Sequence, residues 1–193
     1  MYIIFFGPPG VGKGTQAVIV AERTGWEHIS TGDMLRAHVA EGSALGKKAQ
    51  GYMQKGLLTP DDLVIDMFMD RLRQIGERGF VLDGFPRTLP QAEALDEALA
   101  RDGRAIDLAI NITAPDDVLM ERMLGRAAEG GRADDTPEAM HVRLDVQKPP
   151  AELLDHYRRS GKLKDVDGRP PVADVTRAVM AALGVDAGTT GAR

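Results

Sequence analysis

The hydrophobic residues of the chain gather in short unbroken runs, separated by longer stretches in which apolar and polar residues mix. A short apolar run bounded by turn residues is typical of a buried strand, and the longer stretches have helical character. Strands alternating with helices predict an α/β fold, in which helices flank both faces of a five-stranded parallel sheet. The expected strands are residues 2–6, 27–29, 80–82, 108–112 and 163–166.

Two helix starts are marked by a threonine placed directly before a proline, at residues 59–60 and 136–137, with acidic residues following. The threonine hydroxyl suits the cap position, and proline suits the first helical position, where no backbone N–H is needed. We therefore expect these threonines to cap helices that begin at the prolines. Residues 114–117 carry a weaker form of the same signal.

Two segments interrupt the alternation of strands and helices. Residues 30–59 are polar and repeatedly broken by glycine, and we expect short helices that form a flap. Residues 126–135 are rich in glycine and arginine, as is usual for a lid beside a ligand site. We expect one domain over residues 1–193, with a core of 1–29, 60–125 and 136–185 and a tail, 186–193, that frays.

The bulk composition excludes several classes of protein. The chain has 193 residues, 43% of them hydrophobic, which is enough for one globular domain with a buried core. A net charge of -5 without any Lys/Arg-rich block argues against a nucleic-acid or membrane surface. The absence of cysteine excludes disulfides and cysteine-ligated zinc. With no leader-like start and no apolar run that could span a membrane, we expect a cytoplasmic protein.

A candidate phosphate-binding loop follows the first expected strand. Residues 7–15 read GPPGVGKGT, whose glycines let backbone N–H groups turn toward an anion, while a helix starting near Lys13 directs its positive end to the same point. This favours a P-loop fold that binds a nucleotide triphosphate; an ordinary Gly/Pro turn is the alternative. The strict pattern has Ser or Thr directly after the lysine, whereas this chain has Gly14 there and Thr15 one place later.

Asp83 follows the expected strand 80–82, close to the phosphate loop. Magnesium keeps most of its waters and is commonly held by one or two carboxylates together with substrate phosphates. We therefore expect Asp83 to hold Mg²⁺ through water. A role as a helix cap or turn residue is the alternative.

Six arginines flank the expected site. Arg122 and Arg126 lie four positions apart, on one helix face, although such a pair can equally be solvated surface. Glycines on either side of Arg126 indicate a hinged loop that could bring several guanidinium groups together. Planar, always-charged donors of this kind neutralise the charge of a moving phosphoryl group. The six are Arg36, Arg87, Arg122, Arg126, Arg132 and Arg143.

Four segments resemble the signature segments of the adenylate kinase family. They are residues 7–15, STGDMLR at 30–36, LDGFPR at 82–87 and GRADD at 131–135. They occur in the family's order over nearly the whole chain, and Gly14 is the residue that nucleoside monophosphate kinases also carry. The resemblance implies a magnesium-dependent enzyme that converts ATP and AMP reversibly into two ADP, in adenine nucleotide homeostasis and AMP salvage.

The resemblance also implies roles for individual residues. The ATP site would comprise Gly10, Val11, Gly12, Lys13, Gly14, Thr15, Arg122, Arg126, Gly168 and Pro170. The AMP site would comprise Thr31, Arg36, Leu57, Leu58, Thr59, Gly84, Phe85, Pro86, Arg87 and Gln91, with Arg132 and Arg143 toward the phosphoryl junction. Catalysis would rest on Lys13, Arg87, Arg122, Arg126, Arg132 and Arg143. Because an AMP phosphate is already anionic, no general base is expected.

The resemblance further narrows the substrates. UMP/CMP kinases usually carry Ala and Asn where this chain has Thr31 and Gln91, so AMP is the expected acceptor. The lid is the short form, without the insertion and zinc-binding cysteines of long-lid members, so no zinc is expected. The implied partners are ATP, AMP and ADP, bound by a monomer.

One segment departs from the family pattern. Residues 147–151 are one residue shorter than usual, and two prolines should end the preceding helix at about Lys148. The orientation of Arg143 depends on how this shortened segment folds.

The sequence argues against three alternative functions. Another nucleoside monophosphate kinase would differ in its acceptor base. A GTP-dependent switch would need an Asn-Lys-x-Asp guanine reader, which the chain lacks. A catalytically inactive nucleotide-binding protein would have no need of Lys13, Asp83 and the six arginines.

Overall fold

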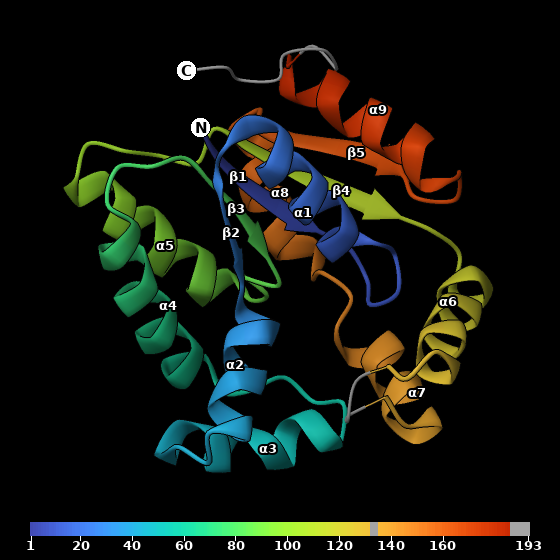
Figure 1. Cartoon of the computed structure of the whole chain (residues 1–193). Coiled ribbons are helices and arrows are strands. Elements are labelled where there is room, and N and C mark those ends of the chain that lie inside the picture. Colours follow the sequence, from blue (N-terminus) through green and yellow to red (C-terminus); the bar gives the residue numbers. More distant parts are fainter. Residues whose placement is uncertain (132–134, 186–193) are drawn as a thin grey trace.

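The computed structural model describes residues 1–131 and 135–185, and in these ranges the core is a five-stranded sheet (Figure 1). The strand order is β2-β3-β1-β4-β5, and every neighbouring pair is parallel. The expected fold class and all five expected strands are confirmed, four of them extending one residue further than expected. The strands are β1 (Tyr2–Phe6), β2 (Glu27–Ser30), β3 (Phe80–Asp83), β4 (Leu108–Thr113) and β5 (Leu163–Asp167).

Both faces of the central strand β1 are buried, which explains why its sequence is apolar throughout. Successive strand residues point to opposite faces. Ile3 and Phe5 therefore join one hydrophobic cluster, whereas Ile4 and Phe6 join the other. The first face is covered by α1 (Lys13–Thr24) and α9 (Val172–Leu183), and the second by α4 (Asp61–Ile75), α5 (Leu89–Arg101) and α8 (Ala151–Arg159).

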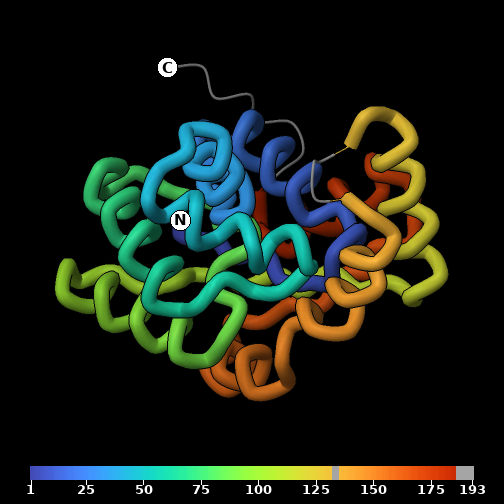
Figure 2. The backbone as a smooth tube through the Cα atoms, turned by 90° about the horizontal axis from the view of Figure 1, so that it is seen from below, coloured from blue at the N-terminus to red at the C-terminus, as the bar shows by residue number. Residues whose placement is uncertain are grey.

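Two pairs of helices extend beyond this layered core. The first pair, α2 (Thr31–Ala40) and α3 (Ala44–Gln54), supplies the short helices expected in residues 30–59. The second is α6 (Asp116–Ala128) and α7 (Pro137–Val146). Figure 2 shows α3 and α7 side by side. Helix α6 ends at Ala128 and so includes the first three residues of the expected lid, 126–135. The division of the chain into core, flap and lid stays a prediction.

The two pairs of helices meet closely at Gly56. Its φ of +73° lies in the left-handed region, and a Cβ at this position would be 2.5 Å from the carbonyl oxygen of Ala139 on α7. Both the backbone conformation and the lack of space therefore require glycine.

One of the two expected threonine caps is correct. Thr136 accepts a hydrogen bond from the Ala139 N–H at 3.2 Å, at the start of α7. The expectation for Thr59 is wrong, because Pro60 has an extended ψ of 142° and α4 begins only at Asp61, without a side-chain cap. Helix α7 ends at Val146, two residues earlier than expected.

The described part of the chain contains no helix long and apolar enough to cross a membrane. The tail that was expected to fray, residues 186–193, lies outside the described residues.

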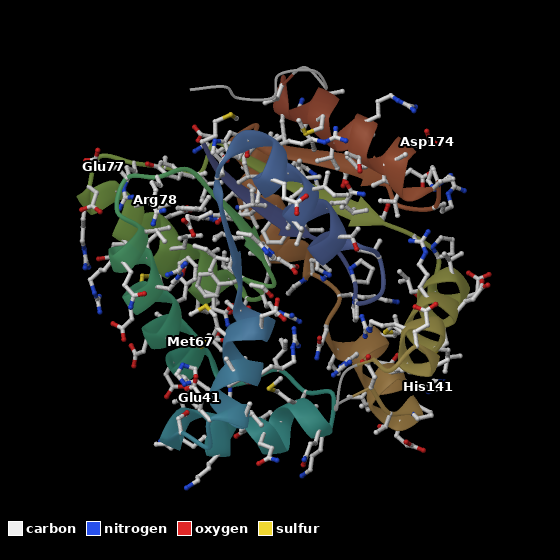
Figure 3. All side chains as sticks on the ribbon, viewed as in Figure 1. Glu41, Met67, Glu77, Arg78, His141 and Asp174 are labelled. Carbon is white, nitrogen blue, oxygen red and sulfur yellow. The ribbon has the colours of Figure 1, made fainter. Side chains whose placement is uncertain are left out.

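The packing of α2 against α3 depends on Gly46. Helix α2 ends at Ala40, and after its cap residue Glu41, labelled in Figure 3, the chain turns back into α3. A Cβ on Gly46 would lie 1.9 Å from the carbonyl oxygen of His38 on α2, a distance that requires the two helices to separate.

We predict that Gly46→Ala lowers the free energy of unfolding by about 1–3 kcal/mol, the usual cost of overpacking. The matched control is Gly51→Ala in the same helix, where a Cβ would meet nothing within 4 Å. That variant should gain about 0.5–1 kcal/mol from helix propensity. Urea denaturation with hydrogen exchange of α2 and α3 measures both. Equal stability of the two alanine variants would contradict the packing argument.

Candidate active site

The carboxyl ends of the strands open into a cleft of about 660 Å³. Its walls come from the loop after β1, the ends of β2 and β3, and the helices that follow them, together with α6, α7 and the loop after β5. Most residues predicted for the site line this one cleft: Gly10, Val11, Gly12, Lys13, Gly14, Thr15, Thr31, Arg36, Leu57, Leu58, Thr59, Asp83, Gly84, Arg87, Gln91, Arg122, Arg126, Arg143 and Gly168.

Three predicted site residues are not brought to the cleft. Phe85 is 1% exposed and stacks on Phe68 in the core, with ring centroids 4.2 Å apart. Pro86 follows a cis peptide bond and lines a separate cavity of about 90 Å³. Pro170 does not line the cleft, and Arg132 lies outside the described residues.

The loop after β1 has the backbone conformation of a phosphate cradle. Gly10 and Gly12 have φ of +81° and +98°, which L side chains rarely adopt. A Cβ on Gly10 would also be 2.7 Å from the carbonyl oxygen of Leu119 on α6. Gly12 forms the cap of α1, so the helix starts immediately after it with its positive end at the cleft.

The structure explains why glycine follows the loop lysine. A Cβ on Gly14 would lie 3.1 Å from Oδ2 of Asp83 at the end of β3. A longer side chain at position 14 would press on this carboxylate. The first turn of α1 and the end of β3 therefore approach each other closely, with Thr15 and Asp83 both on the cleft.

Two cations of the cleft are anchored to backbone carbonyl groups. Lys13 Nζ donates to the carbonyl oxygen of Pro8 at 2.9 Å, across the loop that it follows. Arg122 donates through Nη1 to the carbonyl oxygen of Gly168 at 2.8 Å and through Nη2 to that of Arg169 at 3.1 Å. Arg122 thus ties α6 to the loop between β5 and α9.

Two further arginines share one buried carboxylate. Arg126 donates from Nε and Nη2 to the two oxygens of Asp135 at 2.8 and 2.7 Å, and Arg143 Nη1 donates to Oδ1 at 2.7 Å. The Asp135 side chain is fully buried, and that of Arg143 is 7% exposed. The shortened segment after α7 therefore leaves Arg143 in the cleft, joined through Asp135 to α6.

Hydrogen bonds around the end of β3 fix the position of Arg87. Arg87 Nε and the Thr31 hydroxyl both donate to the carbonyl oxygen of Gly84 at 2.8 Å. Arg87 Nη1 donates to Oε1 of Gln147, and Gln147 Nε2 donates to the carbonyl oxygen of Gly56 at 2.6 Å. Arg36 pairs with Asp33 one turn earlier in α2.

Sequence reasoning missed two glutamines that shape this site. Gln147 links Arg87 to the segment after α3. Gln16 on α1 is 2% exposed, donates to the carbonyl oxygen of Val172 at 3.2 Å and accepts from the Thr176 hydroxyl at 2.9 Å, which fixes α9 against α1. No local motif marks either residue, because each partner lies far away in the sequence.

The cleft is strongly cationic although the whole chain carries a net charge of -5. Carboxylates that line it include Asp33 and Asp83. The cations on its wall are Lys13, Arg36, Arg87, Arg122, Arg126 and Arg143. Clustered donors of one sign in a concave site concentrate anions there.

The loop after β5 carries a local ion pair. Side-chain and backbone hydrogen bonds from Arg169 lower the pKa of Asp167 to about 2. The ionised carboxylate accepts hydrogen bonds from the backbone N–H and the guanidinium group of Arg169 within this loop.

Asp83 is the candidate metal ligand. Its carboxylate lines the cleft near the phosphate loop, which suits a cation held through water and phosphates. Among residues 1–131 and 135–185, no three His, Asp or Glu side chains gather as a ligand cluster.

Comparison with known proteins identifies close relatives. A sequence model described as adenylate kinase matches residues 5–162. The chain is 49% identical over 185 residues to an adenylate kinase of Phenylobacterium zucineum, covering 95% of this chain and 97% of the relative. It is 43% identical to an adenylate kinase of Lachnospira eligens, covering 95% of this chain and 100% of that relative. It is 46% identical to an adenylate kinase of Parvibaculum lavamentivorans, covering 96% of this chain and 93% of that relative.

We predict that Asp135→Asn lowers the free energy of unfolding by about 3 kcal/mol, because it removes the buried carboxylate charge that Arg126 and Arg143 share. The matched control is Asp155→Asn, which breaks an exposed pair with Arg158 within α8. That change should cost less than about 1 kcal/mol. Chemical denaturation of both variants measures the difference. A loss at Asp135 no greater than at Asp155 would contradict the structural role of the buried pair.

Proposed function

This chain belongs to the adenylate kinase family, and we propose that it catalyses the reversible transfer of a phosphoryl group from ATP to AMP, giving two ADP. The observation that carries the proposal is the convergence of one lysine and five arginines on a single cleft at the end of a phosphate loop. Phosphoryl transfer requires this arrangement, since charge spreads over the oxygens of the moving group. The fold, the family and the positive charge of the cleft all support this proposed activity.

We assign the ATP side to the phosphate loop and α6. Backbone N–H groups of residues 10–15 would hold the phosphates, with Lys13 on the transferred group. Arg122 supports this assignment through its hydrogen bonds to Gly168 and Arg169, because it couples α6 to the loop that would contact the adenine near Gly168 and Pro170. Arg126 would complete the ATP side.

We assign the AMP side to the ends of β2 and β3. Arg36 and Arg87 would hold the AMP phosphate, and Thr31 and Gln91 would select the base. Leu57, Leu58, Thr59 and residues 84–86 would surround the nucleoside, Phe85 and Pro86 through their backbone. Arg143, with Arg132, would stabilise the junction between the two nucleotides.

Catalysis would then consist of alignment and charge neutralisation. The attacking AMP oxygen is anionic near neutral pH, so no side chain has to remove a proton. Arginines fixed by carbonyl groups and by Asp135 need little rearrangement when the phosphates arrive, and preorganised donors of this kind lower the barrier. Enclosing the junction excludes water that would otherwise hydrolyse ATP.

Mg²⁺ would be held near Asp83, whose carboxylate beside Thr15 fits a water-mediated cation. When bound with ATP, this ion neutralises phosphate charge.

We also propose that the protein acts as a monomer in the cytoplasm, with free nucleotides as partners, because one chain supplies both sides of the cleft.

The rival function is another nucleoside monophosphate kinase. Initial rates of ADP formation from ATP with AMP, GMP, CMP or UMP, with and without magnesium, distinguish the two. We expect activity with AMP and magnesium, and little with the pyrimidine nucleotides. A preference for CMP or UMP would replace the proposal with its rival, and no transfer to any acceptor would overturn it.

We predict that Lys13→Met and Arg87→Ala each lower kcat/KM by at least about 10²-fold, the scale seen when one donor to a developing charge is lost. The matched control is Arg73→Ala, which removes an exposed arginine of α4 and should leave activity unchanged. Thermal unfolding shows whether the variants remain folded. Near-normal turnover by a folded Lys13→Met or Arg87→Ala variant would refute the assigned roles.

A further inference from the structure

Gln91 is held by two partners that both restrict how its amide can lie. It is 2% exposed and lines the cleft. Its Oε1 accepts from the backbone N–H of Arg87 at 2.7 Å, and its Nε2 donates to Oδ1 of Asp61 at 2.7 Å. An ionised carboxylate only accepts and a backbone N–H only donates, so the two partners agree on one orientation.

Asp61 reaches this position from behind the cleft wall. It is the first residue of α4, half-buried, and does not line the cleft. Its second oxygen, Oδ2, accepts from the hydroxyl of Thr88, the cap of α5, at 2.7 Å. Asp61 therefore joins the starts of α4 and α5, which pack against each other (Figure 1), and is itself fixed by Thr88.

The fixed amide keeps part of its hydrogen-bonding capacity. An amide oxygen has two lone pairs and an amide nitrogen two hydrogens, and Asp61 and Arg87 use one of each. One lone pair on Oε1 and one hydrogen on Nε2 remain for a base, in a defined order. If the amide turned over, its nitrogen would face the Arg87 N–H and its oxygen would face the Asp61 carboxylate, so both contacts would be repulsive.

We propose that Asp61 is a specificity-determining positioning residue, which locks the Gln91 amide in the orientation that accepts a 6-aminopurine and rejects a 6-oxopurine. This inference rests on the proposed function. Adenine presents a donor at N6 beside an acceptor at N1, which matches Oε1 and Nε2 in the locked order. Hypoxanthine and guanine present an acceptor at O6 beside a donor at N1, so each locked atom meets a group of its own kind.

The first test uses the unaltered enzyme with three acceptors that differ only at the base edge: AMP, purine ribonucleoside monophosphate, which lacks the 6-amino group, and IMP. The lock predicts that kcat/KM falls from AMP to the purine nucleotide, and falls again by at least about tenfold to IMP, because IMP is repelled where the purine nucleotide merely lacks one bond. An amide that turns freely would accept IMP at least as well as the purine nucleotide. That result would overturn the proposal while leaving AMP activity, and so the proposed function, intact.

The second test is Asp61→Ala, since water in place of the carboxylate can donate as well as accept. We expect the AMP preference over IMP, as a ratio of kcat/KM, to shrink by at least about tenfold. The matched control, Asp62→Ala, removes the same charge from the same helix end without touching Gln91 and should leave the ratio unchanged. An unchanged ratio in folded Asp61→Ala, or an equal change in Asp62→Ala, would contradict the lock. The measurement with unaltered enzyme decides the question if Asp61→Ala fails to fold.

Discussion

The parallel pairing of β1 with β3 on one side and β4 on the other is the constraint on which the rest of the structure depends. Because all neighbouring strands run the same way, their carboxyl ends lie along one edge. The phosphate loop, Thr31 and the loop at Gly168 follow β1, β2 and β5, and Asp83 is the last residue of β3. Segments far apart in sequence therefore open on one cleft. The apolar strands that make the sheet are thus also what gathers the polar site.

Hydrogen bonds and ion pairs restrain the charged groups of the cleft before any nucleotide binds. Arg122 is held by carbonyl groups, Arg126 and Arg143 share Asp135, and Arg87 bonds to Gly84 and Gln147. Such partners limit the rearrangement that charge stabilisation would otherwise require. The same logic extends to the neutral Gln91, whose amide orientation is set by Asp61 and the Arg87 backbone.

Much of the fold could be predicted from the sequence, because the central strands β1, β3 and β4 are buried on both faces and therefore appear as apolar runs. The phosphate loop could also be predicted, because its glycines Gly10 and Gly12 have positive φ values that L side chains rarely adopt. The cap at Thr59 could not be judged from residue types, because the ψ of Pro60 decides where α4 begins. Gln147 and Asp61 were missed for another reason: their partners are 27 or more residues away, and only the folded chain brings them together.

In the proposed reaction, this cleft aligns two nucleotides and passes a phosphoryl group between them while excluding water. Single-turnover reaction with ATP carrying a radioactive γ-phosphate tests it most directly, with the products separated after quenching. Direct transfer to AMP predicts that the label appears in ADP only when AMP is present, with negligible label in inorganic phosphate. Release of the label as inorganic phosphate at a comparable rate, or failure of the label to reach AMP, would contradict it.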